Sequence, residues 1–198
     1  YCKSEFIDPD ANVICDENDY KSDFFDVSHW ENNYVNNQSD EIANYLAVIN
    51  TIPNASAVVF NKLNIQIDVL SARLAGFHKA GDWLFYILAL NSRVNNKIAF
   101  NVNKLNYYVR HDTSVYGANH KNNIMFYEVL SIYEYVLTQN MIDKTLFDKI
   151  LKQIILWLKW FDYSAKCNRL YTNVLELSSV ELFINILKQE FDKSEDQV

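Results

Sequence analysis

Apolar side chains recur at three- and four-residue steps along much of the chain, a spacing that places them on one face of an α-helix. This pattern predicts helices over about 40–50, 55–79, 83–90, 94–109, 123–139, 145–162 and 178–192. A side-chain oxygen suited to an N-cap stands at or just before the start of five of them, at Ser39, Asn54, Asp82, Thr145 and Ser178. We therefore predict an all-α fold of six or seven helices, arranged as a bundle or as stacked helical hairpins.

The beginning of the chain departs from this pattern. Residues 1–38 lack helical periodicity, are rich in Asp and Asn, and contain Pro9. We predict an irregular acidic arm over 1–38, a single helical domain over 39–192 and a frayed tail over 193–198.

Composition limits the class of protein. The chain has 198 residues, of which 49% are apolar and 22% charged, so it can bury a core and is not a disordered chain. Its formal net charge of −7 argues against a general DNA-coating protein. Because no run of 18 residues is free of charged or amide side chains, we expect no transmembrane helix.

The charge is distributed unevenly. Residues 1–41 carry eleven acidic residues and two lysines, whereas residues 42–175 have a net charge of +6. An acidic segment can steer a basic partner, and exposed aromatic side chains can anchor it. The predicted partner-binding residues are Asp16, Glu17, Asp19, Asp23, Asp26, Trp30, Trp157 and Trp160.

These features favour a non-catalytic interaction protein that binds one protein partner, of the inhibitor, immunity or host-interaction type. A structural component of a larger, viral assembly is an alternative. The three glycines, Gly76, Gly81 and Gly117, form no phosphate-binding loop. We expect no cofactor and no nucleic-acid partner, and the sequence leaves the oligomeric state and the compartment open.

Two short segments suggest a further alternative, an enzyme that acts on a polyanion. Arg73 and His78, with four residues between them on a predicted helix, resemble the catalytic motif of HEPN ribonucleases. The resemblance implies acid–base catalysis by the histidine and phosphate binding by the arginine. The segment 116–120, which ends at His120, resembles part of the α/α-toroid lyases of hyaluronate and chondroitin. An enzyme would then depend on Arg73, His78, His111 and His120.

Metal-binding patterns are weak. Five residues follow the oxygen-ligand spacing of a Ca²⁺-binding loop, namely Asp8, Asp10, Asn12, Asp16 and Asp19. Val13 stands where that loop needs a glycine, so we interpret the segment as an acidic arm. His111, Asp112 and His120 match no compact zinc-site spacing. We expect no bound metal.

The cysteine count is odd. Cys2 and Cys15 would close a small loop if they paired, and Cys167 would remain unpaired. Because the chain starts at Tyr1 and not at a methionine, we expect a processed, excised or incomplete product.

Overall fold

The computed structural model describes residues 1–19, 21–52, 54–61, 67–110, 124–138, 145–150 and 152–153. The chain forms two compact units, Tyr1–Ile142 and Asp143–Val198, and each is described by itself. In the second unit, residues 145–150 are helical, and Leu146, Phe147 and Ile150 are buried. The predicted helix over 178–192 and the boundary at 192 lie outside the described residues, so the predicted domain limits stay a prediction.

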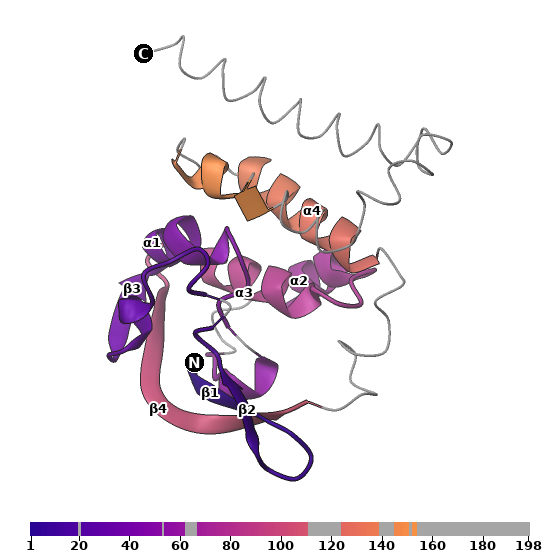
Figure 1. Ribbon diagram of the computed structural model, residues 1–198. Helices are drawn as coiled ribbons and strands as arrows, with labels where there is room; N and C mark the ends of the chain where they lie inside the picture. The colour runs from indigo at the N-terminus through magenta and orange to yellow at the C-terminus, as the bar shows by residue number, and fades with distance from the viewer. Residues whose placement is uncertain are drawn as a thin grey trace. The chain divides into compact units, whose positions relative to one another are not determined.

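The first unit contains a four-stranded sheet, and the prediction of an all-α fold is therefore wrong (Figure 1). Its strands are β1 (Cys2–Ile7), β2 (Val13–Asp16), β3 (Tyr34–Asn37) and β4 (Lys97–Val109). The spatial order is β2-β1-β4-β3, with β1 parallel to β4 and the two outer pairs antiparallel. Three of the strands come from the segment that we predicted to be an irregular arm.

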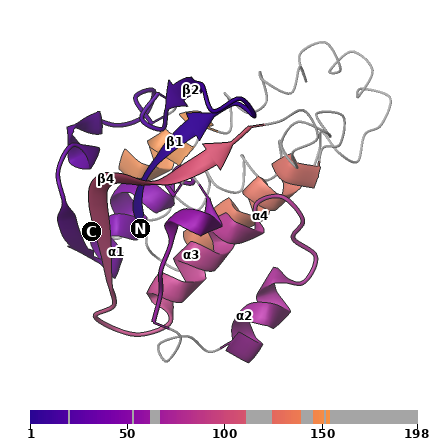
Figure 2. The ribbon, with the colours of Figure 1, turned by 90° about the horizontal axis from the view of Figure 1, so that it is seen from below.

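Strand β4 is the longest element of the sheet and curves along it (Figure 1). Its first four residues pair with β3, and its later residues pair with β1 (Figure 2). We predicted a helix over 94–109, but Ile98 and Phe100 are buried while Lys97 and Ala99 are exposed. This alternation has the period of two that belongs to a strand.

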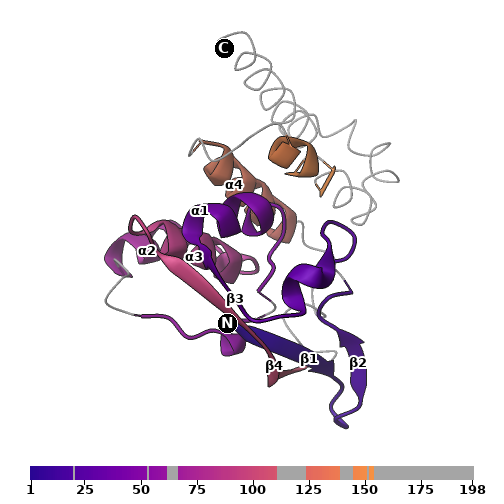
Figure 3. The same cartoon turned by 90° about the vertical axis from the view of Figure 1, so that its left-hand side faces the viewer.

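Helices lie on one side of the sheet, with α1, α3 and α4 above it in Figures 1 and 3. The regular helices are α1 (Gln38–Glu41), α2 (Ile67–Leu74), α3 (Gly81–Asn91) and α4 (Ile124–Thr138). A π-helical turn, η2 (Ile42–Leu46), continues α1, and the 3₁₀ turns are η1 (Val27–Trp30) and η3 (Ala55–Ala57). Helices α3 and α4 confirm the predictions over 83–90 and 123–139.

The predicted helix over 55–79 is wrong in its first part, because η3 is a single 3₁₀ turn and residues 58–61 are not helical. Two caps also differ from prediction: α1 follows Asn37 instead of Ser39, and α3 follows Ala80 instead of Asp82.

Side chains of α3 and α4 fix the segment after η2. The indole Nε1 of Trp83 donates to the carbonyl of Leu46 at 2.7 Å. The hydroxyl of Tyr133 donates to the carbonyl of Val48 at 2.8 Å. The two rings also meet edge to face, with centroids 5.7 Å apart. Buried polar atoms are thereby satisfied within an apolar core.

A buried carboxylate of α4 organises the start of α3. Glu128 accepts hydrogen bonds from the backbone N–H groups of His78, Lys79 and Ala80, at 2.6, 2.8 and 2.7 Å. Because the Glu128 side chain is buried, water cannot readily take the place of its carboxylate oxygens as the acceptor for these three N–H groups. One side chain of α4 therefore satisfies three donors in the turn that leads into α3.

Replacing Glu128 with Gln tests this contact. The amide nitrogen would face backbone donors, and we expect the free energy of unfolding to fall by about 2 kcal/mol. Urea denaturation measures this loss. Glu134→Gln, at an exposed position of the same helix, is the control and should change stability by less than about 0.5 kcal/mol. Equal effects of the two substitutions would contradict the proposed contact.

Candidate functional site

The sheet has two chemically different faces. Ser4 and Phe6 of β1 are buried, so the alternating residues Lys3, Glu5 and Ile7 point to the opposite side of the sheet. In register with them stand residues of both neighbouring strands. We call this side the outer face, and define it by Lys3, Glu5, Ile7, Val13, Asp16, Lys104, Tyr107 and Val109. Leu105 falls in the register shift between Lys104 and Asn106.

Several apolar side chains on these strands are exposed to solvent. The exposed fractions are 60% for Val13, 47% for Ile14, 67% for Leu105, 62% for Tyr107 and 43% for Val109. Single exposed apolar side chains are ordinary, but a group of them on one surface is typical of a binding site.

Charged side chains cross the same face. Lys3 Nζ lies 3.2 Å from Asp16 Oδ2, and Lys104 forms an ion pair with Glu5 and lies 4.0 Å from Asp16. Burial alone would raise the pKa of Asp16, but hydrogen bonds from Asn18 and Lys3 hold that pKa below its ordinary value. The hydrogen bond to Glu5 raises the pKa of Lys104. These ion pairs tie the three strands together on their solvent side.

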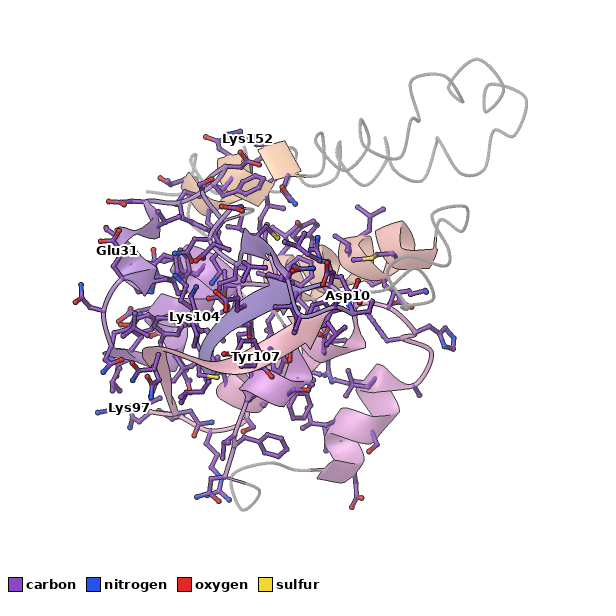
Figure 4. The ribbon with its side chains drawn as sticks, turned by 60° about the horizontal axis from the view of Figure 1, so that its bottom comes forward. Asp10, Glu31, Lys97, Lys104, Tyr107 and Lys152 are labelled. Carbon is purple, nitrogen blue, oxygen red and sulfur yellow. The ribbon has the colours of Figure 1, made fainter. Side chains whose placement is uncertain are left out.

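The second half of β4 presents an open strand edge. β3 pairs only with residues Lys97–Phe100. The N–H of Arg110 donates to the carbonyl of Ile7 at 2.8 Å, so the alternate residues Tyr107 and Val109 turn their backbone groups away from β1. Leu105 falls in a register shift and pairs with no residue of β1. In the described part of the chain, no strand pairs with that edge. Figure 4 labels Lys104 and Tyr107 on this strand.

Behind β1, a buried ion pair holds the segment that follows β2. Glu17 and Lys21 are both fully buried, and Lys21 Nζ lies 2.9 Å from Glu17 Oε1. Glu17 Oε2 accepts the backbone N–H of Ser4 at 2.7 Å. The Lys21 ammonium also lies 4.5 Å from the ring centroid of Trp30. Burial lowers the pKa of Lys21, and the charge of Glu17 opposes that effect.

Next to this pair, His29 is enclosed by aromatic rings. It stacks on Tyr34 and Tyr45 with centroids 4.1 and 4.0 Å apart, and meets Trp30 edge to face at 4.8 Å. Its Nε2 lies 3.8 Å from Glu41 Oε2. Burial lowers the pKa of His29, and the charge of Lys21 adds to this shift.

Glu41 ends a chain of hydrogen bonds. Its carboxylate accepts from Tyr34 Oη at 3.1 Å and from Asn36 Nδ2 at 2.8 Å. Tyr34 Oη lies 2.6 Å from Tyr1 Oη, which accepts from Trp30 Nε1 at 2.8 Å. Burial raises the pKa of Glu41 despite these donors. The network joins Tyr1 to η1, β3 and α1 and is a structural element of the interior.

The predicted partner-binding residues separate into three groups. Asp16 lies on the outer face, and Asp19, Asp23 and Asp26 are exposed. Glu17 and Trp30 are buried, which removes them from any partner-binding surface of this unit. The i, i+4 spacing of Glu17 and Lys21 is the one sequence signal for their pairing. Trp157 and Trp160 lie outside the described residues.

The residues of the enzyme alternative do not form the expected helical motif. Helix α2 ends at Leu74, and Gly76 has a φ of 99°, so Arg73 and His78 do not share a helix. The Arg73 guanidinium lies 5.3 Å from the ring centroid of Tyr135, and His78 is exposed. His111 and His120 lie outside the described residues.

The predicted Ca²⁺ ligands have other roles. Asp8 Oδ1 accepts the N–H groups of Asp10 and Asn12 at 2.9 and 2.8 Å, which closes the turn between β1 and β2. In the ranges that the structure describes, no three or more His, Cys, Asp or Glu side chains gather into a possible metal site. Within the same ranges, Cys2 and Cys15 are free thiols.

The fold and surface define a mixed α/β unit with an exposed sheet face and an open strand edge. Comparison with family models, with curated proteins and with solved structures finds no match to this chain. Among the described helices, none has the length and apolar character needed to cross a bilayer.

The enclosure of His29 predicts a pH-dependent stability. Because its pKa is lower in the folded protein than the ordinary value of 6.5, the unfolded chain binds the proton more readily. The contribution of His29 is therefore present above pH 6.5 and is lost as the pH falls toward the folded pKa. We expect His29→Phe, which keeps the ring stacking, to lose less stability than wild type between pH 7.5 and 5.0.

Denaturant unfolding at the two pH values measures this difference. His78→Gln is the control, since His78 is exposed, and it should show the wild-type loss. If the His29→Phe protein lost as much stability as wild type between pH 7.5 and 5.0, His29 would not be a source of the pH dependence.

Proposed function

We propose that this chain is a non-catalytic protein-binding module that receives an extended segment of one partner on the open edge of β4. The observation that supports the proposal is the coincidence at Leu105, Tyr107 and Val109 of exposed apolar side chains and of backbone groups that no described strand pairs with. An extended partner strand would satisfy the backbone groups and cover the side chains together.

A partner strand would bind to β4 through the same interactions that join neighbouring strands of a sheet. Backbone hydrogen bonds to alternate residues of β4 supply affinity without sequence preference, and the flanking side chains supply specificity. Tyr107 suits this role, because it combines a large apolar area with a polar hydroxyl. The partner segment would therefore place apolar side chains at every second position, opposite the outer face.

Net charge disfavours a second copy of this chain as the partner. Two chains that each carry a net charge of −7 repel one another. A basic protein avoids this repulsion.

The acidic residues near the sheet would act on the rate of association. Asp19, Asp23 and Asp26 are exposed, and Figure 4 labels Asp10 and Glu31 on either side of the outer face. Together with the net charge of −7, they would attract a basic partner before contact.

A double substitution, Leu105→Asp with Tyr107→Asp, tests the docking edge. Protein captured by the wild-type chain from an extract of its source should bind the variant at least about 30-fold more weakly, as is typical when central interface residues are lost. Calorimetric titration of the captured partner measures the affinity. Val94→Asp changes a strongly exposed apolar residue away from the edge and should leave binding unchanged. Equal affinities of all three chains, or the absence of a captured partner, would contradict the proposal.

A triple substitution, Asp19→Lys, Asp23→Lys and Asp26→Lys, tests the electrostatic contribution. We expect the association rate with the same partner to fall by at least about tenfold at low salt, with little change in the dissociation rate. The difference should disappear near 0.5 M salt, where charges are screened. Stopped-flow measurements at both salt concentrations provide the rates. A loss that persists at high salt would exclude steering.

A further inference from the structure

An exposed and extended segment, residues 58–61, follows η3 and runs beside α3 in Figure 2. Val59 is 94% exposed and Phe60 is 53% exposed. The backbone of Val58 is extended, with a φ of −117° and a ψ of 134°, and no residue of the segment belongs to a helix or a strand. In the described part of the chain, no hydrogen bond joins the backbone of Val59 or Phe60 to another residue. Another protein can therefore contact this stretch of backbone while the sheet and the helices stay folded.

Phe60 is held less firmly than a residue of the core. Its ring meets that of Phe85 in α3 edge to face, with centroids 5.3 Å apart, and about half of its surface stays in contact with solvent. Turning this ring outward breaks no hydrogen bond and no strand pairing. The side chain is thus available to a pocket of another protein that binds a large apolar group.

Endoproteases need these features in a folded substrate. They bind the chain as an extended strand through its backbone, and those with an apolar pocket select a large apolar side chain on the amino side of the bond that they cut. Exposed connecting segments are their preferred sites in folded proteins. The segment 58–61 offers an extended backbone, an exposed neighbour in Val59 and a suitable side chain in Phe60.

The other exposed apolar side chains in the described part of the chain lie in strands, in helix α2 or in a tight turn. Leu105 and Tyr107 lie in β4, within the stretch that pairs with β1, so a protease could bind them only after the strands separate. Val94 is 85% exposed, but Asn95 follows it with a left-handed φ of 68°, which an extended strand does not have. This comparison favours the bond after Phe60.

We propose that the peptide bond between Phe60 and Asn61 is a site of limited proteolysis in the folded protein, cut by endoproteases that accept a large apolar side chain. The reaction is a hydrolysis that consumes one water molecule. The water oxygen bonds to the carbonyl carbon of Phe60, the C–N bond breaks, and the nitrogen of Asn61 becomes a new amino group.

The two products stay together as a two-chain protein. Strands β1 and β3 precede the cut, whereas β4, with which both of them pair, follows it. Trp83 and Tyr133, which follow the cut, donate hydrogen bonds to the carbonyls of Leu46 and Val48, which precede it. The sheet and the core therefore join the two pieces, and the open edge of β4 is kept.

Brief digestion of the full chain with chymotrypsin, in buffer without denaturant, tests the proposal. Mass spectrometry should find new ends at Phe60 and Asn61, formed at least about 100-fold faster than any cut after Tyr107, which requires the sheet to open. The two products should co-elute in size-exclusion chromatography in the same buffer and separate in concentrated guanidinium chloride.

Urea distinguishes cleavage of the folded protein from cleavage of an unfolded fraction. If the cut needed unfolding, its rate would rise about tenfold in about 1 M urea, because urea increases the unfolded fraction. We expect less than about a twofold change at Phe60. A synthetic peptide with the sequence of residues 58–61 corrects for the effect of urea on the protease itself.

Variants identify the side chain responsible. Phe60→Ser should slow the cut at this bond by at least about tenfold, whereas Phe60→Leu, which keeps a large apolar group, should retain it. Val94→Ser is the matched control at another exposed apolar residue and should be cut at the wild-type rate.

Four results would overturn the proposal: no cut after Phe60, a rate that rises with urea as unfolding does, an unchanged rate in Phe60→Ser, or products that separate in buffer without denaturant. None of these measurements involves the partner proposed for β4, so their outcome is independent of the proposed protein-binding function.

Discussion

The sheet depends on the buried ion pair between Glu17 and Lys21. Its carboxylate accepts the backbone N–H of Ser4 in β1, and its ammonium lies over the ring of Trp30, which belongs to η1. Removing one partner would leave a buried charge without compensation, which is far more unfavourable than losing a surface pair. The pair therefore holds the acidic segment against the interior and supports β1 from behind. The outer face includes residues of β1, and the open edge belongs to β4, which pairs with β1, so both depend on the position of β1.

A second constraint is the parallel pairing of β1 with β4, which joins residues about one hundred positions apart. Both strands contribute side chains to the outer face, so neither β1 nor β4 forms that surface alone. The ion pairs of Lys104 with Glu5 and Asp16 cross all three strands and help to fix their register. Because such a register arises from contacts distant in sequence, the open edge of β4 exists only in the folded unit.

Local pattern predicted α3 and α4 because both carry long apolar runs at helical spacing. The start of β4 carries the alternation of a strand at Ile98, Phe100 and Val102, but β1 lacks a comparable signal. In β1 only Phe6 marks the buried face with an apolar side chain, and Ser4 marks it with a hydroxyl. The acidic composition misled us for a related reason. Glu17, Glu41 and Glu128 are buried, because lysine, tyrosine, asparagine and backbone donors satisfy them in three dimensions. Exposed acids such as Asp19 were predictable from composition, but the open edge of β4 was not.

The two halves of the long strand β4 have different surroundings. Its first residues pair with β3, and its last residues carry the open edge. Between them the register with β1 shifts twice, and the side chains of Asn33 and Asn101 accept the N–H groups of Val102 and Asn103. Asparagine oxygens thus replace strand pairing where β4 leaves β3, which allows the strand to bend without unsatisfied donors at these positions. The bend turns the second half of the strand away from β3 and so leaves its outer edge open in the described part of the chain.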